Sequence, residues 1–200
     1  MAVLCSRVRA PGRQEWTKLV RMMKFLHRTK DDMLTLSKGH GSIQLEWYVD
    51  ASFAIHPDYR GHTGAAFKFK GGKGFLIQRS SKQKLNASSS TTSELIGVDD
   101  VLPKILWIPL FLKEQGYDVV DNNVYKDNTL AILLEENGRK SAGERTRALN
   151  VRYFVITDHV NKGDVKIKHC PMDKMVADYY MKPLQGKKFE EFRKQIMGFV

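Results

Sequence analysis

Four acidic residues, far apart along the chain, occupy positions that suit metal-dependent chemistry. Asp50 and Asp127 each follow a short run of residues typical of a β-strand. Glu94 lies in the first turn of an expected helix, and Asp178 lies on a later one. Carboxylate oxygens are preferred ligands of Mg²⁺, and carboxylates packed together repel each other unless a cation compensates them. The four residues therefore indicate a magnesium site, provided that the fold brings them together.

The net charge of the chain indicates the class of molecule on which such a site would act. Lys and Arg number 33 against 22 Asp and Glu, a formal net charge of +11. This surplus favours a polyanionic partner, nucleic acid before a membrane surface. Two divalent ions about 3.5–4 Å apart can clamp a scissile phosphate, one activating water and the other stabilising the leaving oxygen. Carboxylates surrounded by basic residues are therefore typical of phosphodiester hydrolysis.

Each acid also has an ordinary structural explanation. Thr91 and Glu94 fit a capping box at a helix start, and Asp127 fits the cap of the helix that follows it. Asp50 fits a turn and Asp178 a solvated helix surface. Taken together, the four acids favour a shared chemical role over four separate structural ones. A strand-like run ends in Asp twice, and both runs precede the kind of element that such a site needs.

Composition excludes several other classes of protein. With 42% hydrophobic and 10% aromatic residues, the chain is not a disordered one. No apolar run approaches the roughly 18 residues of a membrane span, and the first 16 residues carry charges where a signal peptide is apolar. Cys5 and Cys170 have no ligand or disulfide spacing. We therefore expect an intracellular protein, cytoplasmic or nuclear and not secreted, with no membrane partner.

Hydrophobic periodicity predicts the elements that must position the acids. Strands are predicted over 43–49, 65–70, 75–78, 119–126 and 165–168, and helices over 15–27, 92–116, 128–138, 151–160, 172–181 and 187–199. Pro103 and Pro109 predict a kink in the long helix or two shorter helices. The glycines of 71–74 predict a hairpin turn, since the spacing of a phosphate-binding loop is absent.

This order predicts an α/β fold. Three antiparallel strands and then two further strands form a mixed sheet flanked by helices. The break at 38–41 places this domain over 41–200, after a helical extension over 1–40.

Six segments in order resemble the ribonuclease H region of copia-type LTR retrotransposon polyproteins. They are Tyr48-Val49-Asp50-Ala51-Ser52, Ser80-Ser81-Lys82-Gln83-Lys84, Ser89 to Leu95, Asp127 to Ile132, Thr146-Arg147 through Val151 to Phe154, and Ala177 to Leu184. Residues 1–40 resemble the tail of the reverse-transcriptase and connection region that precedes this domain in the polyprotein.

The resemblance implies a ribonuclease H-like fold and hydrolysis of the RNA strand of RNA–DNA hybrids during reverse transcription. Asp50, Glu94, Asp127 and Asp178 match the four acids that bind two Mg²⁺ ions in this family, for which Mn²⁺ is a substitute. The implied partners are the hybrid and the reverse-transcriptase portion of the parent polyprotein.

Further residues are candidates for contacts with the hybrid, because we expect them on loops or helix starts near the acids. They are Ser52, Lys82, Lys84, Asn128, Arg145 and Arg147. His169, nine positions before Asp178, lies roughly where some ribonucleases H have a proton-shuttling His. His56 and His62 show no partner in the sequence.

Four departures from the family pattern keep an alternative open. Ala148 stands where His is common, Asn150 where an acid is frequent, Met181 where Thr is usual and Thr92 where a further Glu is common. None of them removes a matched acid. They motivate the hypothesis of a non-catalytic remnant that binds nucleic acid or acts as a scaffold. A transposase or integrase of similar fold is a third hypothesis, but its signature is not matched.

Overall fold

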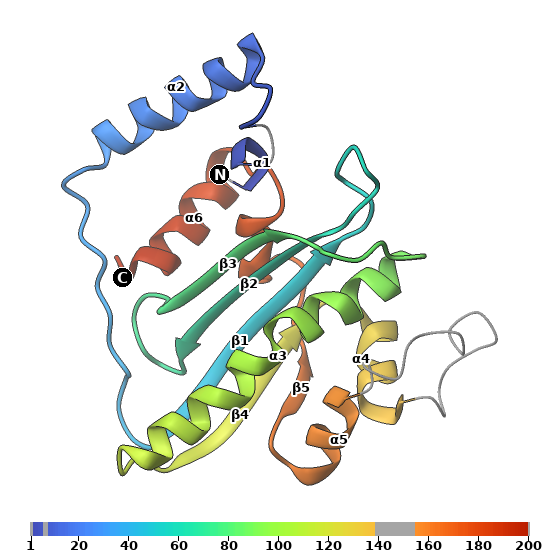
Figure 1. The fold of residues 1–200 in the computed structure, drawn as a ribbon. Coiled ribbons are helices and arrows are strands. Elements are labelled where there is room, and N and C mark those ends of the chain that lie inside the picture. The colour runs from blue at the N-terminus through green and yellow to red at the C-terminus, as the bar shows by residue number, and fades with distance from the viewer. Residues whose placement is uncertain (1, 6–7, 139–154, 200) are drawn as a thin grey trace. The chain divides into compact units, whose positions relative to one another are not determined.

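The computed structural model describes the chain except for residues 1, 6–7, 139–154 and 200 (Figure 1). The chain forms two compact units, Met1–Leu34 and Thr35–Val200. The four acids named above all belong to the second unit. None of the helices within the described residues is long and apolar enough to cross a membrane.

The first unit contains α1 (Ala2–Cys5) and α2 (Arg13–Arg28). The main-chain amide of Gly12 donates to the Glu15 carboxylate at 3.0 Å, which closes the first turn of α2. The sequence places the boundary after residue 40, whereas residues 35–40 belong to the second unit. The amide of Thr35, for example, donates to the Met197 oxygen at 2.9 Å. The origin of 1–40 in a polymerase tail stays a prediction.

A five-stranded mixed sheet forms the centre of the second unit (Figure 1). Its strands are β1 (Ile43–Ser52), β2 (His62–Phe69), β3 (Ile77–Lys82), β4 (Val119–Lys126) and β5 (Lys166–His169). The spatial order is β3-β2-β1-β4-β5. The first three strands pair antiparallel, and β4 and β5 join β1 as parallel strands. The α/β fold class expected from the sequence is confirmed.

The glycine cluster forms the turn between β2 and β3, as expected for a hairpin. Gly71 and Gly74 have φ angles of 68° and 66°, in the left-handed region that favours glycine. A Cβ atom on Gly74 would also lie 2.3 Å from the main-chain oxygen of Thr35. The turn therefore needs glycine for both its conformation and its packing.

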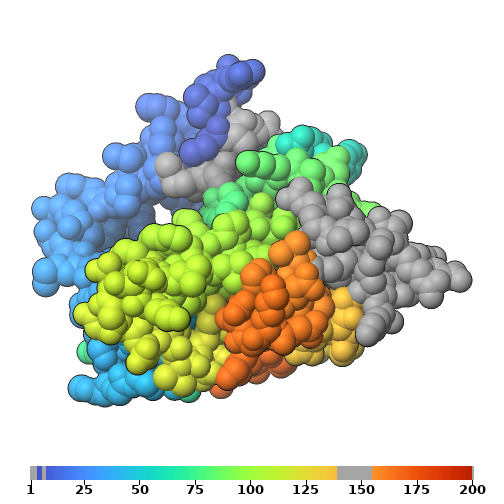
Figure 2. Space-filling model, turned by 60° about the horizontal axis from the view of Figure 1, so that its bottom comes forward, coloured from blue at the N-terminus to red at the C-terminus, as the bar shows by residue number. Residues whose placement is uncertain are grey.

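One face of the sheet packs against α3 (Ser90–Glu114). Alternate residues of β1, among them Leu45, Trp47 and Val49, are fully buried and share one cluster with the inner side of α3. Figure 2 shows this helical side of the second unit, where α5 (Val155–Lys162) lies beside α3. Burial of this apolar surface is the main favourable term that holds the sheet and helix together.

The long helix is continuous through Pro103 and Pro109, so the expectation of two shorter helices is wrong. Pro109 has no amide to donate to the oxygen of Ile105, four residues earlier. The side-chain amide of Asn122 on β4 donates to that oxygen at 3.0 Å instead. A tertiary hydrogen bond therefore replaces the missing helical one.

The other face of the sheet is covered near its β2 side by the end of the chain. The 3-10 helix η3 (Val176–Tyr180) and α6 (Gly186–Met197) bring Val176, Phe192 and Ile196 onto Ala66. The predicted helix over 172–181 is thus only a short 3-10 turn. The remaining helix, α4 (Thr129–Asn137), follows β4.

Candidate metal centre

Asp50 lies within β1, two residues before the strand ends, and not in a turn. It is paired with Gly64 of β2, and only 3% of the residue is exposed. Its Oδ1 accepts a hydrogen bond from the amide of Ala51 at 2.8 Å. Its Oδ2 is buried and accepts no hydrogen bond from the described residues. Asp50 therefore offers an unused carboxylate oxygen at this end of the sheet.

Glu94 reaches the same place from the start of α3. The helix is capped by Ser89, whose hydroxyl accepts from the Thr92 amide at 3.1 Å, so the capping box with Thr91 is not formed. Glu94 consequently lies beyond the first turn, two residues later than a capping role requires. Its Oε1 accepts from the Ala51 amide at 3.3 Å. Its buried Oε2 accepts no hydrogen bond from the described residues but lies 3.3 Å from the Lys126 ammonium.

Asp127 follows β4 directly. Asn128, and not Asp127, caps α4: its side-chain oxygen accepts from the amides of Leu130 and Ala131 at 3.1 Å each. Because β1 and β4 are adjacent and parallel, Asp50 and Asp127 meet at the same end of the sheet. Oxygen atoms of Asp50, Glu94 and Asp127 lie within 4.8 Å of one another.

Asp178, the fourth acid, lies on η3 and is buried, not solvated. It stands beside the group of three and is linked to it through Lys182. The Lys182 ammonium pairs with Oδ1 of Asp178 and lies 3.8 Å from Oδ2 of Asp50. Three of the four acids are thus gathered, and the fourth shares a lysine with one of them.

Gly64 allows η3 to approach the sheet this closely. A Cβ atom on Gly64 would lie 2.7 Å from the oxygen of Ala177 and 2.4 Å from Cγ of Met181. Either distance is too short for a real contact, so any larger residue would push η3 and its aspartate away. Gly64 is paired with Asp50 in the sheet. The close approach of η3 to Gly64 therefore brings the element that carries Asp178 to the position of Asp50.

Burial and the close packing of the acids raise the pKa values of two of them. Burial, with the Glu94 and Asp127 charges added, raises the pKa of Asp50 to about 9. Burial and the Glu94 charge also raise the pKa of Asp127. Burial would lower the pKa of Lys182, but the hydrogen bond to Asp178 and the charge of Asp50 raise it overall. Acids held in this state gain from a nearby cation.

The donor set fits a hard divalent cation. Three carboxylates converge, and the buried oxygens of Asp50 and Glu94 accept no hydrogen bond from the described residues. Mg²⁺ and Mn²⁺ favour oxygen ligands, while zinc sites favour His and Cys, neither of which belongs to this group. The arrangement can therefore hold a divalent ion at the end of β1.

Sequence reasoning missed two buried residues that position Glu94. The ammonium of Lys126 is fully buried, 3.3 Å from Oε2 of Glu94 and 2.8 Å from Oε1 of Glu135. Gln83 donates to the Ser93 oxygen at 2.8 Å and to the Thr63 hydroxyl at 3.2 Å. Both residues are polar within or beside strand-like runs. Their pattern resembles that of a solvated surface, so only the fold reveals their partners.

Four of the six predicted substrate contacts lie within the described residues. Ser52 shares the face of β1 with Asp50, and its hydroxyl is 3.9 Å from the Met181 sulfur. Lys82 pairs with Asp58 at 2.6 Å, and Asn128 is occupied as a helix cap. Lys84 and His169 are exposed. Arg145 and Arg147, with the departures Ala148 and Asn150, lie outside the described residues. The roles of all these residues stay predictions.

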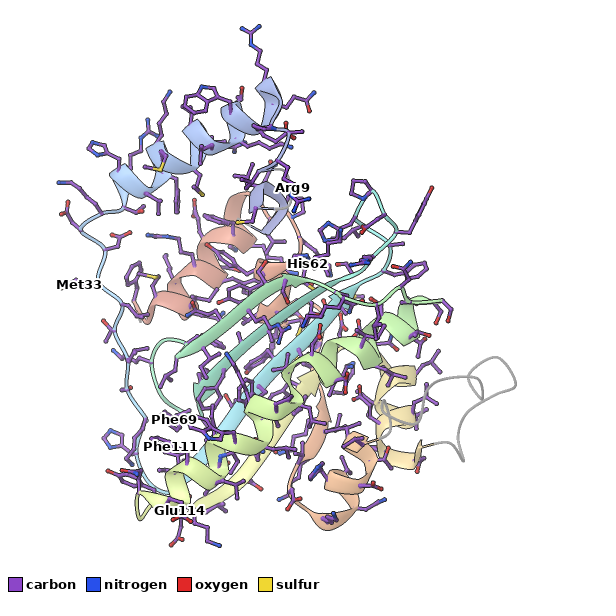
Figure 3. All side chains as sticks on the ribbon, viewed as in Figure 1. Arg9, Met33, His62, Phe69, Phe111 and Glu114 are labelled. Atoms are coloured by element: carbon purple, nitrogen blue, oxygen red, sulfur yellow. The ribbon has the colours of Figure 1, made fainter. Side chains whose placement is uncertain are left out.

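His56 and His62, without partners in the sequence, form a short hydrogen-bonded chain. Nε2 of His56 lies 3.0 Å from Nδ1 of His62, and Nε2 of His62 lies 3.0 Å from the Ser80 hydroxyl. That hydroxyl donates to the oxygen of Tyr180 at 2.7 Å. Burial lowers the pKa of His62 to about 4, so this ring is neutral at neutral pH. The chain ties the loop before β2 to η3, and Figure 3 places His62 at the start of β2, with Phe69 at the other end of the strand.

The chain is similar to retrotransposon polyproteins over most of its length. The Pol polyprotein of transposon TNT 1-94 from Nicotiana tabacum is 31% identical over 189 residues, which are 94% of this chain and 14% of that protein. The Pol polyprotein of transposon RE2 from Arabidopsis thaliana is 28% identical over 187 residues, 93% of this chain and 13% of that protein. The chain therefore spans about a seventh of the length of these curated relatives.

No protein-family model matches the chain. Among solved structures, the chain is similar to the solution structure of the PFV RNase H domain, with 18% identity and a TM-score of 0.46. That similarity covers 78% of this chain and 91% of the other.

Proposed function

We propose that this chain, whose homologues over 94% of its length are Pol polyproteins of retrotransposons, contains a ribonuclease H-type endonuclease domain. It would hydrolyse the RNA strand of RNA–DNA hybrids during reverse transcription. One observation carries the proposal: Asp50, Glu94 and Asp127, from three separate elements, place carboxylate oxygens within 4.8 Å of one another. Metal-dependent hydrolysis of a phosphodiester needs carboxylates that converge in this way.

Asp50, Glu94 and Asp127 would hold the first divalent ion, Mg²⁺ or Mn²⁺. When bound, divalent ions lower the pKa of the attacking water and stabilise charge on the leaving oxygen. Lys126 and the Ala51 amide fix the orientation of Glu94. The second ion expected from the sequence stays a prediction, since Asp178 is engaged by lysines.

Residues outside the metal centre would make the contacts with the substrate. The net charge of +11 favours the phosphates of the DNA strand, and the 2′-hydroxyls mark the RNA strand. Ser52, Lys82, Lys84 and Asn128 are the described candidates for these contacts. The polymerase portion of the parent polyprotein is the proposed protein partner.

Cleavage of a labelled hybrid tests the proposal. Purified protein with Mg²⁺ or Mn²⁺ should degrade the RNA strand and leave single-stranded RNA and duplex DNA intact. Asp50→Asn and Asp127→Asn should abolish cleavage, while Asp118→Asn, at an exposed acid between α3 and β4, should retain it. Circular dichroism checks that each variant is folded. Cleavage that survives both active-site changes would rule the proposal out.

The second candidate function is a hybrid-binding domain without catalysis. It is favoured by Asp178, whose two carboxylate oxygens are already paired with Lys182 and Lys188. This alternative predicts hybrid binding that weakens steeply with salt and no cleavage at any Mg²⁺ or Mn²⁺ concentration. The same assay, run beside a binding titration, separates the two functions.

A further inference from the structure

Lys182 is anchored so that its side chain starts close to the acids. Its main-chain amide donates to the oxygen of Asp178 at 2.8 Å, immediately after η3. Its ammonium then folds back onto Oδ1 of Asp178 and lies 3.8 Å from Oδ2 of Asp50. The side chain is 44% exposed, which leaves it an open route to solvent.

Asp50 is an acid of the group of three that forms an ion pair with this lysine. Its Oδ2, which accepts no hydrogen bond, faces the Lys182 charge, and the same carboxylate belongs to the group with Glu94 and Asp127. A second cation held between Asp50 and Asp178 would need the oxygens that Lys182 now contacts. An ammonium and a divalent ion at the same oxygens repel each other, so the two compete for this pair of carboxylates.

Lys188 also contacts Asp178 but has a different role. Its ammonium lies 3.1 Å from Oδ2 of Asp178, donates to the Met172 oxygen at 3.2 Å and sits 5.2 Å from the centre of the Phe192 ring. These contacts hold it on the outer side of Asp178. Within the described residues, the lysine that joins Asp178 to Asp50 is Lys182.

We propose that Lys182 is a built-in competitor for the second divalent ion. While its ammonium bridges Asp50 and Asp178, the site takes up one ion through Asp50, Glu94 and Asp127. A second ion binds only when the ammonium leaves for solvent. This inference rests on the proposed metal centre and adds to it a residue that sets the number of ions bound. Lys182 is thus a positioning residue for the carboxylates.

Counting bound Mn²⁺ tests the inference without any measurement of cleavage. The electron paramagnetic resonance signal of free Mn²⁺, followed during titration at neutral pH, gives the number and affinity of bound ions. The wild-type chain should bind one ion well and a second one weakly. Lys182→Met keeps the length of the side chain but removes its charge. It should strengthen the second binding step by about tenfold, within the range typical of coupling between two ligands.

Two variants serve as controls. Lys187→Met removes an equally positive charge from the exposed first turn of α6 and should bind like the wild type. Lys182→Arg keeps the charge and should also leave the second step weak. If Lys182→Met is unstable without metal, ions are counted after refolding in Mn²⁺, where two bound ions are expected.

The possible results separate the inference from the proposed function. An unchanged second step in Lys182→Met, or a wild-type chain that binds two ions equally well, overturns the inference and leaves the metal centre standing. A second step strengthened equally in Lys182→Arg and Lys182→Met also overturns it, because charge would not be the cause. A wild-type chain that binds no Mn²⁺ at all contradicts the proposed metal centre itself.

Discussion

The ammonium of Lys126 lies beside Glu94, 3.3 Å from its Oε2 and 3.2 Å from its main-chain oxygen, with no exposed surface. The same ammonium pairs with the buried Glu135 at 2.8 Å. Burial would lower the pKa of Lys126, but the two glutamates raise it overall, so the lysine is charged. A buried cation therefore holds one candidate metal ligand in place.

This relationship predicts a specific pattern of stability. Lys126→Met leaves Glu135 buried without a partner, and loss of one member of a buried pair costs about 3–5 kcal/mol. The double variant Lys126→Met/Glu135→Leu removes both charges and should recover most of this loss. Urea unfolding of the wild type and the two variants measures the difference. A double variant as unstable as the single one would show that the pairing does not explain the loss.

The free energy of unfolding of the metal-free protein should fall as pH rises from about 6.5 to 8.5. The range begins at about the ordinary pKa of His, so that His titration contributes little. Asp50 has a pKa of about 9 in the folded chain and the ordinary 3.8 when unfolded. Between these values the folded state binds more protons than the unfolded state, so stability is lost with rising pH. Asp50→Asn carries no such proton and should flatten the slope.

The measurement is urea unfolding in a chelating buffer at several pH values. The range avoids more acidic pH, where His62 would add a slope of its own. Because the pKa of His62 is lowered to about 4 in the folded protein, the protein loses stability as pH falls below 6.5. Mg²⁺ should reduce the slope in the wild type, because a bound cation favours the charged carboxylate. A slope that is equal in Asp50→Asn would assign it to another group.

Gly64→Ala should displace η3 and weaken the site. The added methyl group meets the Ala177 oxygen and the Met181 side chain, and overpacking of this kind costs about 1–3 kcal/mol. Adding Met181→Ala relieves the side-chain contact alone. The double variant should stay destabilised, because the contact with the main chain remains. Thermal unfolding and Mn²⁺ titration measure both effects, and full recovery in the double variant would contradict this account.

Gln83→Ala should loosen the start of α3. The variant leaves the Ser93 oxygen and the Thr63 hydroxyl without their donor, at about 1–3 kcal/mol for each unsatisfied group. Because Ser93 precedes Glu94, affinity for Mn²⁺ should fall along with stability. The exposed Gln115→Ala, at the far end of the same helix, is the matched control. Unchanged metal affinity in a destabilised Gln83→Ala would limit this residue to a structural role.

Local pattern was enough to predict most elements of the second unit. Four of the five strands, the hairpin at 71–74 and the mixed sheet follow from alternation and turn residues, which act over a few positions. The strand predicted over 75–78 lies at Ile77–Lys82 instead. The length of α3 did not follow, because the hydrogen bond from Asn122 to Ile105 joins residues 17 positions apart. The start of α3 was also misplaced, since Ser89 and Thr91 are equally good caps in the sequence alone.

The sequence by itself determined which acids to consider, because strand-like runs and helix starts mark Asp50, Asp127 and Glu94 without any coordinates. The tertiary structure decided how the charges around them are shared. Lys126 and Lys182 contact acids from other elements, and an ammonium on a flexible stem can be assigned a partner only once the fold has brought the elements together. Long-range pairing of charges depends on distance in space, which residue types and spacing do not encode.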